Sequence, residues 1–214
     1  MLLDPGEHTK IFPGAKIAWD DEVQVQELRT YFRNQIPQLV DEITNVWESL
    51  NGKKVLDLGC GPGRLVEAFP EMRFYLGIDQ SLVMINSARE KFPQHHFMCS
   101  RIEDYRNPNR FDVVTCIDVL QHLENPPEEL LRRILVKFDA DIFIFRTYTN
   151  ALSHKLVHKK STGDASASYP VRYFASMIDA INKNTDCMTK MSIVKIPKDQ
   201  QAGVVYITCK RKPI

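Results

Sequence analysis

The chain has 214 residues, of which 43% are hydrophobic and 26% are charged. This composition is ordinary for a single globular domain and excludes a fibrous or intrinsically disordered protein. Lysine and arginine number 28 against 27 aspartate and glutamate, so no global field draws the chain toward nucleic acid or an anionic membrane.

The amino-terminal segment and the cysteines bear on location. MLLDPGEHTK carries acid, proline and glycine where a secretory signal needs an apolar run. No apolar stretch approaches the length that crosses a bilayer, so we expect a cytoplasmic protein without a membrane partner. The five cysteines lack short paired spacing, which favours reduced core residues over a disulfide framework, and we expect no metal site.

The residues before the first predicted strand show helical periodicity. Apolar side chains recur at helical spacing over 25–32 and again over 39–50. Pro37 is expected to divide two helices, because proline is not tolerated in a helix interior. We assign residues 1–50 to an N-terminal helical extension, which either acts as a lid or covers one face of a sheet.

Strands and helices then alternate along the chain. Short apolar runs predict the strands, and caps and prolines bound the helices between them. The expected strands are 53–58, 73–78, 96–99, 111–117 and 141–147. The expected helices are 64–69, 81–92 with Ser81 as N-cap, and 125–138. This order predicts a doubly wound α/β fold, with a mostly parallel sheet and helices on both faces.

The last third of the chain has a different pattern. Residues 149–169 are polar and lack periodicity, which predicts a long loop or an irregular insertion. Residues 171–181 return to helical spacing. The runs 191–196 and 204–209 predict two strands joined by a turn, which would close the sheet with an antiparallel hairpin.

The segment KVLDLGCGPGR places three glycines directly after an apolar strand. Such glycines let the backbone turn sharply and approach a ligand, while the next helix aims free N–H groups at it. Asp79 ends the following strand, where a carboxylate can accept both hydroxyls of an adenosine ribose. The turn and the acid together favour a nucleotide-type ligand over close packing alone.

The spacing of this turn argues against a dinucleotide. Gly59, Gly61 and Gly63 fall as G-x-G-x-G, without the last glycine of G-x-G-x-x-G. Asp57 lies just before the turn, where its carboxylate would repel a pyrophosphate but accept hydrogen bonds from an ammonium group. A ligand with adenosine, an amine and no phosphate fits these residues better.

These motifs resemble those of the class I, Rossmann-like S-adenosylmethionine-dependent methyltransferases. VLDLGCGPGR is similar to their first motif, GIDQS to their second, and FDVVTCIDVLQHL to the strand and loop of their fourth. The resemblance implies a seven-stranded, mostly parallel sheet with an antiparallel C-terminal hairpin and S-adenosylmethionine as cofactor. It makes residues 51–214 the methyltransferase domain, with 149–170 as a polar insertion.

The resemblance also implies a set of cofactor contacts. Asp57 would lie near the methionyl amine, and Asp79 would bind the ribose. Arg101 stands where many relatives have an acid that contacts the adenine amine; either Arg101 is simply exposed or Glu103 substitutes for that acid, and the backbone N–H of Ile102 would still bind the adenine ring. The other implied contacts are Gly59, Cys60, Gly61 and Gly63 in the turn, Gln80 beside the adenine, and Cys116 and Ile117 beside the methionyl portion.

Methyl transfer to a hydroxyl or ammonium group needs a residue that removes a proton. His122 and Asp118 follow the fourth strand, at the edge where ligands collect in this architecture, and histidine accepts a proton near neutral pH. Burial of His122 as packing is the competing interpretation. Tyr148 ends the fifth strand beside Arg146 and Thr147, and it is the third catalytic candidate.

The acceptor is expected to be a small molecule that takes the methyl group at oxygen, nitrogen or carbon. Residues 116–119 read CIDV and lack the Asn/Asp-Pro-Pro-aromatic motif of enzymes that methylate a flipped base. The balanced charge also disfavours nucleic acid. Two other functions stay open: a catalytically silent cofactor-binding subunit of a partner enzyme, and a nicotinamide-dependent oxidoreductase. A homodimer is compatible with the sequence.

Overall fold

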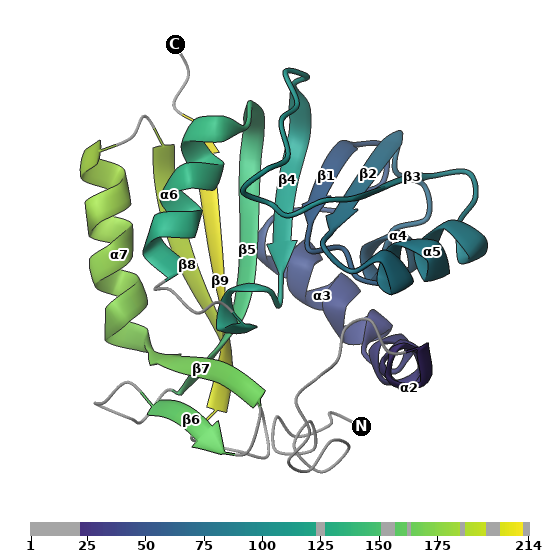
Figure 1. Cartoon of the computed structure of the whole chain (residues 1–214). Helices are drawn as coiled ribbons and strands as arrows, with labels where there is room; N and C mark the ends of the chain where they lie inside the picture. Colours follow the sequence, from purple (N-terminus) through teal and green to yellow (C-terminus); the bar gives the residue numbers. More distant parts are fainter. Residues whose placement is uncertain are drawn as a thin grey trace. The chain divides into compact units, whose positions relative to one another are not determined.

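The computed structural model describes residues 22–122, 127–150, 157–161, 164–184, 187–195 and 202–211 (Figure 1). These residues form two compact units. The glycine-turn unit holds residues 22–117 together with Lys137–Ile144. The C-terminal unit holds the described residues of Asp118–Val136 and those from Phe145 onward.

A parallel sheet forms the centre of the glycine-turn unit. Its strands are β1 (Lys54–Leu58), β2 (Phe74–Asp79), β3 (His96–Cys99), β4 (Phe111–Ile117) and the first half of β5 (Ala140–Asn150). The strand order is β3-β2-β1-β4-β5, and β1 pairs in parallel with both β2 and β4. The apolar runs of β1 and β4 are buried, as expected for central parallel strands.

Four helices belong to the same unit. They are α2 (Glu22–Arg33), α3 (Ile36–Val46), α4 (Arg64–Ala68) and α5 (Leu82–Lys91). Ser81 caps α5 as predicted, because its hydroxyl accepts a hydrogen bond from the Met84 N–H at 3.2 Å. Pro37 lies in the first turn of α3, where its missing N–H is tolerated, so α2 and α3 separate before the proline rather than at it.

The N-terminal helices pack on α4 and α5 of this unit. The guanidinium of Arg64 lies over the ring of Phe32, 4.8 Å from its centroid. Arg29 donates a hydrogen bond to the carbonyl of Ser87 at 2.9 Å. These contacts attach α2 to the helices that follow β1 and β2. The assignment of residues 1–50 as a lid stays a prediction, and residues 1–21 lie outside the described part of the chain.

The C-terminal unit combines the second half of β5 with an antiparallel pair of strands. β8 (Cys187–Lys195) pairs antiparallel with β9 (Ala202–Arg211), and β9 also pairs with β5. The helices of this unit are α6 (Pro127–Lys137), α7 (Val171–Asn184) and the short 3₁₀ helix η1 (Leu120–His122). Figure 1 shows α7 beside β8, and the two are in contact. The predicted antiparallel hairpin is confirmed.

Two further strands lie where the sequence predicts an irregular segment. β6 (Val157–Ser161) pairs antiparallel with β7 (Asp164–Pro170), and β7 pairs in parallel with the end of β5. The prediction of a long loop is wrong for these residues. A hairpin satisfies its backbone groups through the ladder, so strands form here although β6 holds a single apolar residue and the apolar positions of β7 are mostly alanine. Residues 151–156 and 162–163 lie outside the described part.

The expected α/β sheet is therefore confirmed. The predicted seven strands correspond to β1 to β5, β8 and β9, and the first five run parallel where their pairing is described. β4 has the predicted bounds, and β5 extends three residues beyond them to Asn150. Among the described residues, no helix has both the length and the hydropathy of a membrane span.

Candidate cofactor and acceptor sites

The turn after β1 has a backbone conformation that favours glycine. Gly59, Gly61 and Gly63 have φ of 78°, 53° and 87°, in the left-handed region. The N–H groups of Gly59 and Cys60 both donate to the carbonyl of Ile78, at 2.7 and 3.0 Å. The chain therefore turns sharply at the end of β1 and is fastened to the end of β2.

Gly63 and Gly61 meet different surroundings. A Cβ at Gly63 would lie 2.8 Å from two atoms of the Phe92 ring, so packing excludes a side chain there. A Cβ at Gly61 would meet no atom of the described residues within 4 Å. Gly61 therefore borders space that this part of the chain does not fill, as a glycine that approaches a ligand should.

Asp79, the last residue of β2, is held by backbone groups from both sides. Its Oδ2 accepts a hydrogen bond from the Gly61 N–H at 2.9 Å, and its Oδ1 accepts one from the Ser81 N–H at 2.9 Å. A carboxylate has about four acceptor sites in all. The carboxylate of Asp79 is oriented in advance by these two bonds, which fits the ribose role predicted for it.

Asp57 lies within β1 and is 2% exposed. Its Oδ2 accepts a hydrogen bond from the Tyr75 hydroxyl, and its Oδ1 accepts one from the Thr115 hydroxyl, both at 2.8 Å. Burial raises the pKa of Asp57 to about 6, against the lowering effect of these two hydrogen bonds. Because a buried carboxylate lacks hydration, a nearby cation would stabilise its charged form, and an ammonium group suits that role.

The residues predicted to surround the adenine lie directly after β2 and in the turn after β3. The carbonyl of Gln80 accepts a hydrogen bond from the Cys99 thiol at 3.4 Å. The carbonyl of Ile102 accepts one from Lys137 Nζ at 2.7 Å. Arg101, which occupies the place of the relatives' acid, forms an ion pair with Glu103 at 3.6 Å. The hydrogen bond from Lys137 to the Ile102 carbonyl thereby holds this turn in place.

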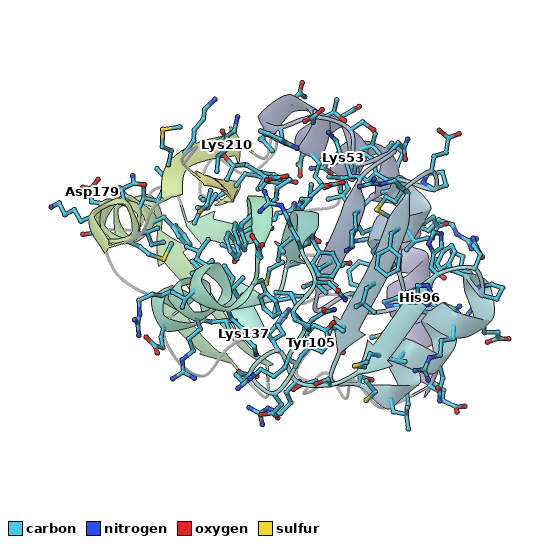
Figure 2. All side chains as sticks on the ribbon, turned by 90° about the horizontal axis from the view of Figure 1, so that it is seen from above. Lys53, His96, Tyr105, Lys137, Asp179 and Lys210 are labelled. Atoms are coloured by element: carbon cyan, nitrogen blue, oxygen red, sulfur yellow. The ribbon has the colours of Figure 1, made fainter. Side chains whose placement is uncertain are left out.

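Lys137 and Phe138 hold that turn in place. The ring of Phe138 stacks on Tyr105 with centroids 6.1 Å apart, and Lys137 Nζ also donates to the carbonyl of Glu103 at 2.9 Å. Figure 2 labels Tyr105 and Lys137 in the same region. The predicted residues Cys116 and Ile117 are buried at the end of β4. All the predicted cofactor residues therefore belong to the glycine-turn unit.

The predicted catalytic residues belong to the C-terminal unit. Both carboxylate oxygens of Asp118 contact Arg146 Nη1, at 2.5 and 2.6 Å. Arg146 Nε donates to the Tyr206 hydroxyl at 2.9 Å. Asp118 is therefore part of an ion pair with Arg146, a contact that the sequence alone does not indicate.

His122 ends η1 and is half-buried, and its backbone N–H donates to the Val119 carbonyl at 2.9 Å. It lies four residues after Asp118 in the same unit. Tyr148 lies in β5, but its side chain is outside the described part of the structure. The catalytic assignments of all three residues stay predictions.

Sequence reasoning missed the residues that hold these groups. Thr115 is the register partner of Asp57 on β4, and Tyr75 comes from β2 on the other side. Tyr206 lies on β9, 60 residues after Arg146. A polar residue inside an apolar strand is the one available signal for such partners, because burial requires it to find a hydrogen bond.

Comparison with known families gives a match to a model described as a methyltransferase domain, over residues 55–136. The ubiquinone biosynthesis O-methyltransferase of Vibrio atlanticus (strain LGP32) is 35% identical over 132 residues, which are 58% of this chain and 54% of the relative. The enzyme of the same name from Neisseria meningitidis serogroup C is 30% identical over 163 residues, 71% of this chain and 66% of the relative. The chain spans about half the length of the first curated relatives.

Solved structures share the fold at low identity. The plantazolicin methyltransferase BpumL in complex with SAH gives a TM-score of 0.62 at 17% identity, covering 96% of this chain and 97% of that one. Magnesium protoporphyrin IX methyltransferase (ChlM) from Synechocystis PCC 6803 with bound SAM gives 0.59 at 16% identity, covering 97% and 90%. The family match, the curated relatives and the glycine turn agree, and residues 55–136 form a methyltransferase domain of the class I, Rossmann-like, S-adenosylmethionine-dependent type.

Proposed function

We propose that this chain transfers a methyl group from S-adenosylmethionine to a small-molecule acceptor, with a hydroxyl oxygen as the acceptor atom. The observation that carries the proposal is the bond from the Gly61 N–H to Asp79, which joins a ligand-approaching turn to an oriented carboxylate. The curated relatives are named ubiquinone biosynthesis O-methyltransferases, which supports oxygen over nitrogen or carbon.

The polar groups of the glycine-turn unit fit this cofactor better than a dinucleotide. Asp57 and Asp79 both contribute carboxylates, which accept bonds from an ammonium group and from ribose hydroxyls. The charge of Asp57, just before the turn, would repel a pyrophosphate. Among the residues that the structure describes, no atom lies within 4 Å of a Cβ at Gly61, which supports close approach of a ligand to the turn.

S-adenosylmethionine, when bound, supplies an electrophilic methyl group on a sulfonium. The chain's own residues would hold it: Asp79 through the ribose, Asp57 through the methionyl amine, and Ile102 through its backbone N–H. Cys116 and Ile117 are buried and apolar, and we assign them the methionyl portion. A site with little water favours a reaction in which concentrated positive charge becomes dispersed.

Proton removal from the acceptor is assigned to His122. A neutral imidazole is available near pH 7 and can accept a hydroxyl proton. Asp118 is the weaker candidate base, because both of its oxygens already contact the Arg146 guanidinium. Tyr148 remains a proposed acceptor contact at the end of β5.

Two measurements on the full chain test this function. In the first, calorimetry compares binding of S-adenosylhomocysteine with binding of NAD⁺, and we expect one-site binding of the former and none of the latter. In the second, labelled S-adenosylmethionine is incubated with a catechol or with a cell metabolite extract, and mass analysis identifies whatever gains the label. Failure to bind S-adenosylhomocysteine would refute the cofactor assignment, whereas binding without any labelled product would favour a catalytically silent subunit.

A further inference from the structure

Asp118 has an unusual backbone conformation at the end of β4. Its φ is 58°, and it is the only non-glycine residue with a positive φ in the described part of the chain. Aspartate adopts this left-handed region more easily than most residues, but the conformation still carries strain. Strain of this kind persists where surrounding interactions hold it, and such positions gather at functional sites.

Three interactions hold Asp118 in this conformation. Its backbone N–H donates to the carbonyl of Arg146 at 2.9 Å, and its carboxylate contacts Arg146 Nη1 through both oxygens. The side chains of Asp118 and Arg146 are only 10% and 5% exposed. Tyr206, which is fully buried, accepts a hydrogen bond from Arg146 Nε at 2.9 Å and so fixes the guanidinium from the other side.

A buried ion pair is weak evidence for a stabilising role. Removing two charged groups from water has a cost, and well-packed apolar residues often stabilise a core as well or better. The presence of this buried pair is therefore better explained by the backbone geometry that it fixes. Here it fixes the conformation and direction of the chain at Asp118, directly after β4.

The segment that this direction controls is η1. It begins two residues after Asp118 and ends at His122. Within the same unit, η1 contacts β7, and β7 pairs with β5 three residues beyond Arg146, through Thr149 and Tyr169. The ion pair and the β7 contact thus hold η1 from two places.

We propose that Asp118 and Arg146, supported by Tyr206, are positioning residues that set the place of η1 and His122 for methyl transfer without touching the acceptor. This inference rests on the proposed function. A base that removes a proton during an in-line transfer must be held accurately, since a displacement of about 1 Å can cost about a hundredfold in rate. The competing role, in which Arg146 binds an anionic acceptor, is disfavoured because Asp118 already compensates its charge.

The test compares Arg146→Lys and Asp118→Asn with the wild-type chain. Arg146→Lys keeps the positive charge but loses the guanidinium geometry, and Asp118→Asn keeps the shape and tolerates a positive φ. Arg110→Lys is the matched control, because Arg110 is an exposed arginine that pairs with Asp139 at 3.1 Å. Three quantities are measured: the S-adenosylhomocysteine dissociation constant, kcat and KM with 3,4-dihydroxybenzoate as a probe acceptor, and amide hydrogen exchange.

The two hydrogen bonds donated by the Asp118 and His122 amides make the exchange measurement specific. We expect both amides to exchange about tenfold faster or more in the two variants, while the amides of β1 and β2 are unchanged. We expect kcat to fall about 30- to 100-fold with little change in KM. S-adenosylhomocysteine affinity should stay within about twofold, which corresponds to a change in binding free energy of less than about 0.5 kcal/mol.

Other outcomes would overturn the positioning role. Unchanged exchange at Asp118 and His122 would show that the pair does not hold η1. A rise in KM with kcat unchanged would show that Arg146 binds the acceptor. Faster amide exchange throughout the chain would show that the Asp118–Arg146 pair only stabilises the fold. Tyr206→Phe provides a milder variant, for which the same local changes should be smaller. The exchange result does not depend on the acceptor, whereas failure of the wild-type chain to bind S-adenosylhomocysteine counts against the proposed function instead.

Discussion

The Oδ2 atom of Asp79 accepts a hydrogen bond from the backbone N–H of Gly61 at 2.9 Å. Two features that are 18 residues apart in the sequence, the glycine turn after β1 and the acid that ends β2, are therefore parts of one arrangement. Asp79 also accepts a hydrogen bond from Ser81, whose side chain caps α5. The position of the carboxylate is thus determined by the turn on one side and by the start of a helix on the other.

Gly61→Ala should abolish cofactor binding while the chain remains folded. No atom of the described part of the chain lies within 4 Å of the added Cβ, so the new methyl group costs only the strain of a positive φ, about 1 kcal/mol. The methyl group would occupy space that the ligand needs. Calorimetry with S-adenosylhomocysteine and urea unfolding measure the two effects separately.

Gly52→Ala is the matched control for this substitution. Gly52 has φ +75°, and a Cβ there also meets no atom within 4 Å. Both variants should therefore lose a similar free energy of unfolding, but only Gly61→Ala should lose affinity. Equal affinities in the two variants would mean that no ligand approaches Gly61.

Gly63→Ala should destabilise the fold more than either of those substitutions. The added Cβ would lie 2.8 Å from the Phe92 ring as well as at φ +87°. Overpacking of this kind costs about 1–3 kcal/mol beyond the backbone strain. The free energy of unfolding in urea measures the loss, and Phe92→Leu in the same chain should recover part of it. A loss no greater than that of Gly52→Ala would contradict the contact.

Asp57 should make the stability of the chain fall as pH rises from about 4 to about 6. Its pKa is raised from 3.8 to about 6 by burial, so the folded state binds more protons than the unfolded state over this window. The contribution is present at low pH and is lost as pH rises through the folded pKa. For a shift of about two pKa units, the contribution of Asp57 to the free energy of unfolding is about 3 kcal/mol larger below this pH window than above it.

Asp57→Asn tests this contribution. The difference in free energy of unfolding between the wild-type chain and the variant should change by about 3 kcal/mol in favour of the variant between pH 4 and pH 7. Unfolding in urea at several pH values gives the curve. Tyr75→Phe, which removes a hydrogen bond that lowers the pKa of Asp57, should move the window to higher pH. Parallel curves for the wild-type chain and Asp57→Asn would show that the carboxyl keeps an ordinary pKa.

His122→Gln should lower kcat about 100- to 10,000-fold, the usual contribution of a general base. S-adenosylhomocysteine affinity should not change. His96→Gln is the control, since His96 is exposed on β3 and contacts Phe74. A His122→Gln enzyme with normal kcat would make His122 a packing residue.

The features that the sequence predicts well depend on local chemistry. The glycine turn, the Ser81 cap and the bounds of β4 follow from residues that act within a few positions of one another. Asp79 was found because the end of a second strand has a defined place in this architecture. Local rules and strand order were enough to identify the cofactor candidates, whose contacts with the cofactor remain predictions.

The features that the sequence does not predict depend on partners far along the chain. Asp57 takes its hydrogen bonds from Tyr75 and Thr115 because of the register of β1 with its two neighbours. Arg146 lies between Asp118 and Tyr206, which come from different elements. The β6–β7 hairpin was not predicted because β6 holds a single apolar residue, Val157, and the alternation of β7 between serine and mostly alanine is a weak strand signal. Register and tertiary packing decide such pairs, and a single sequence records neither.

The central claim is that the glycine turn and Asp79 bind the adenosine portion of S-adenosylmethionine. Asp79→Asn removes the charge and keeps the shape, and Asp139→Asn at an exposed ion pair with Arg110 is its control. A hydrogen bond to a charged group contributes about 1.5–3 kcal/mol, so calorimetry with S-adenosylhomocysteine should show affinity about 10- to 100-fold weaker for Asp79→Asn and unchanged for Asp139→Asn. Equal affinity in the wild-type chain and Asp79→Asn, or no binding by the wild-type chain, would contradict the claim.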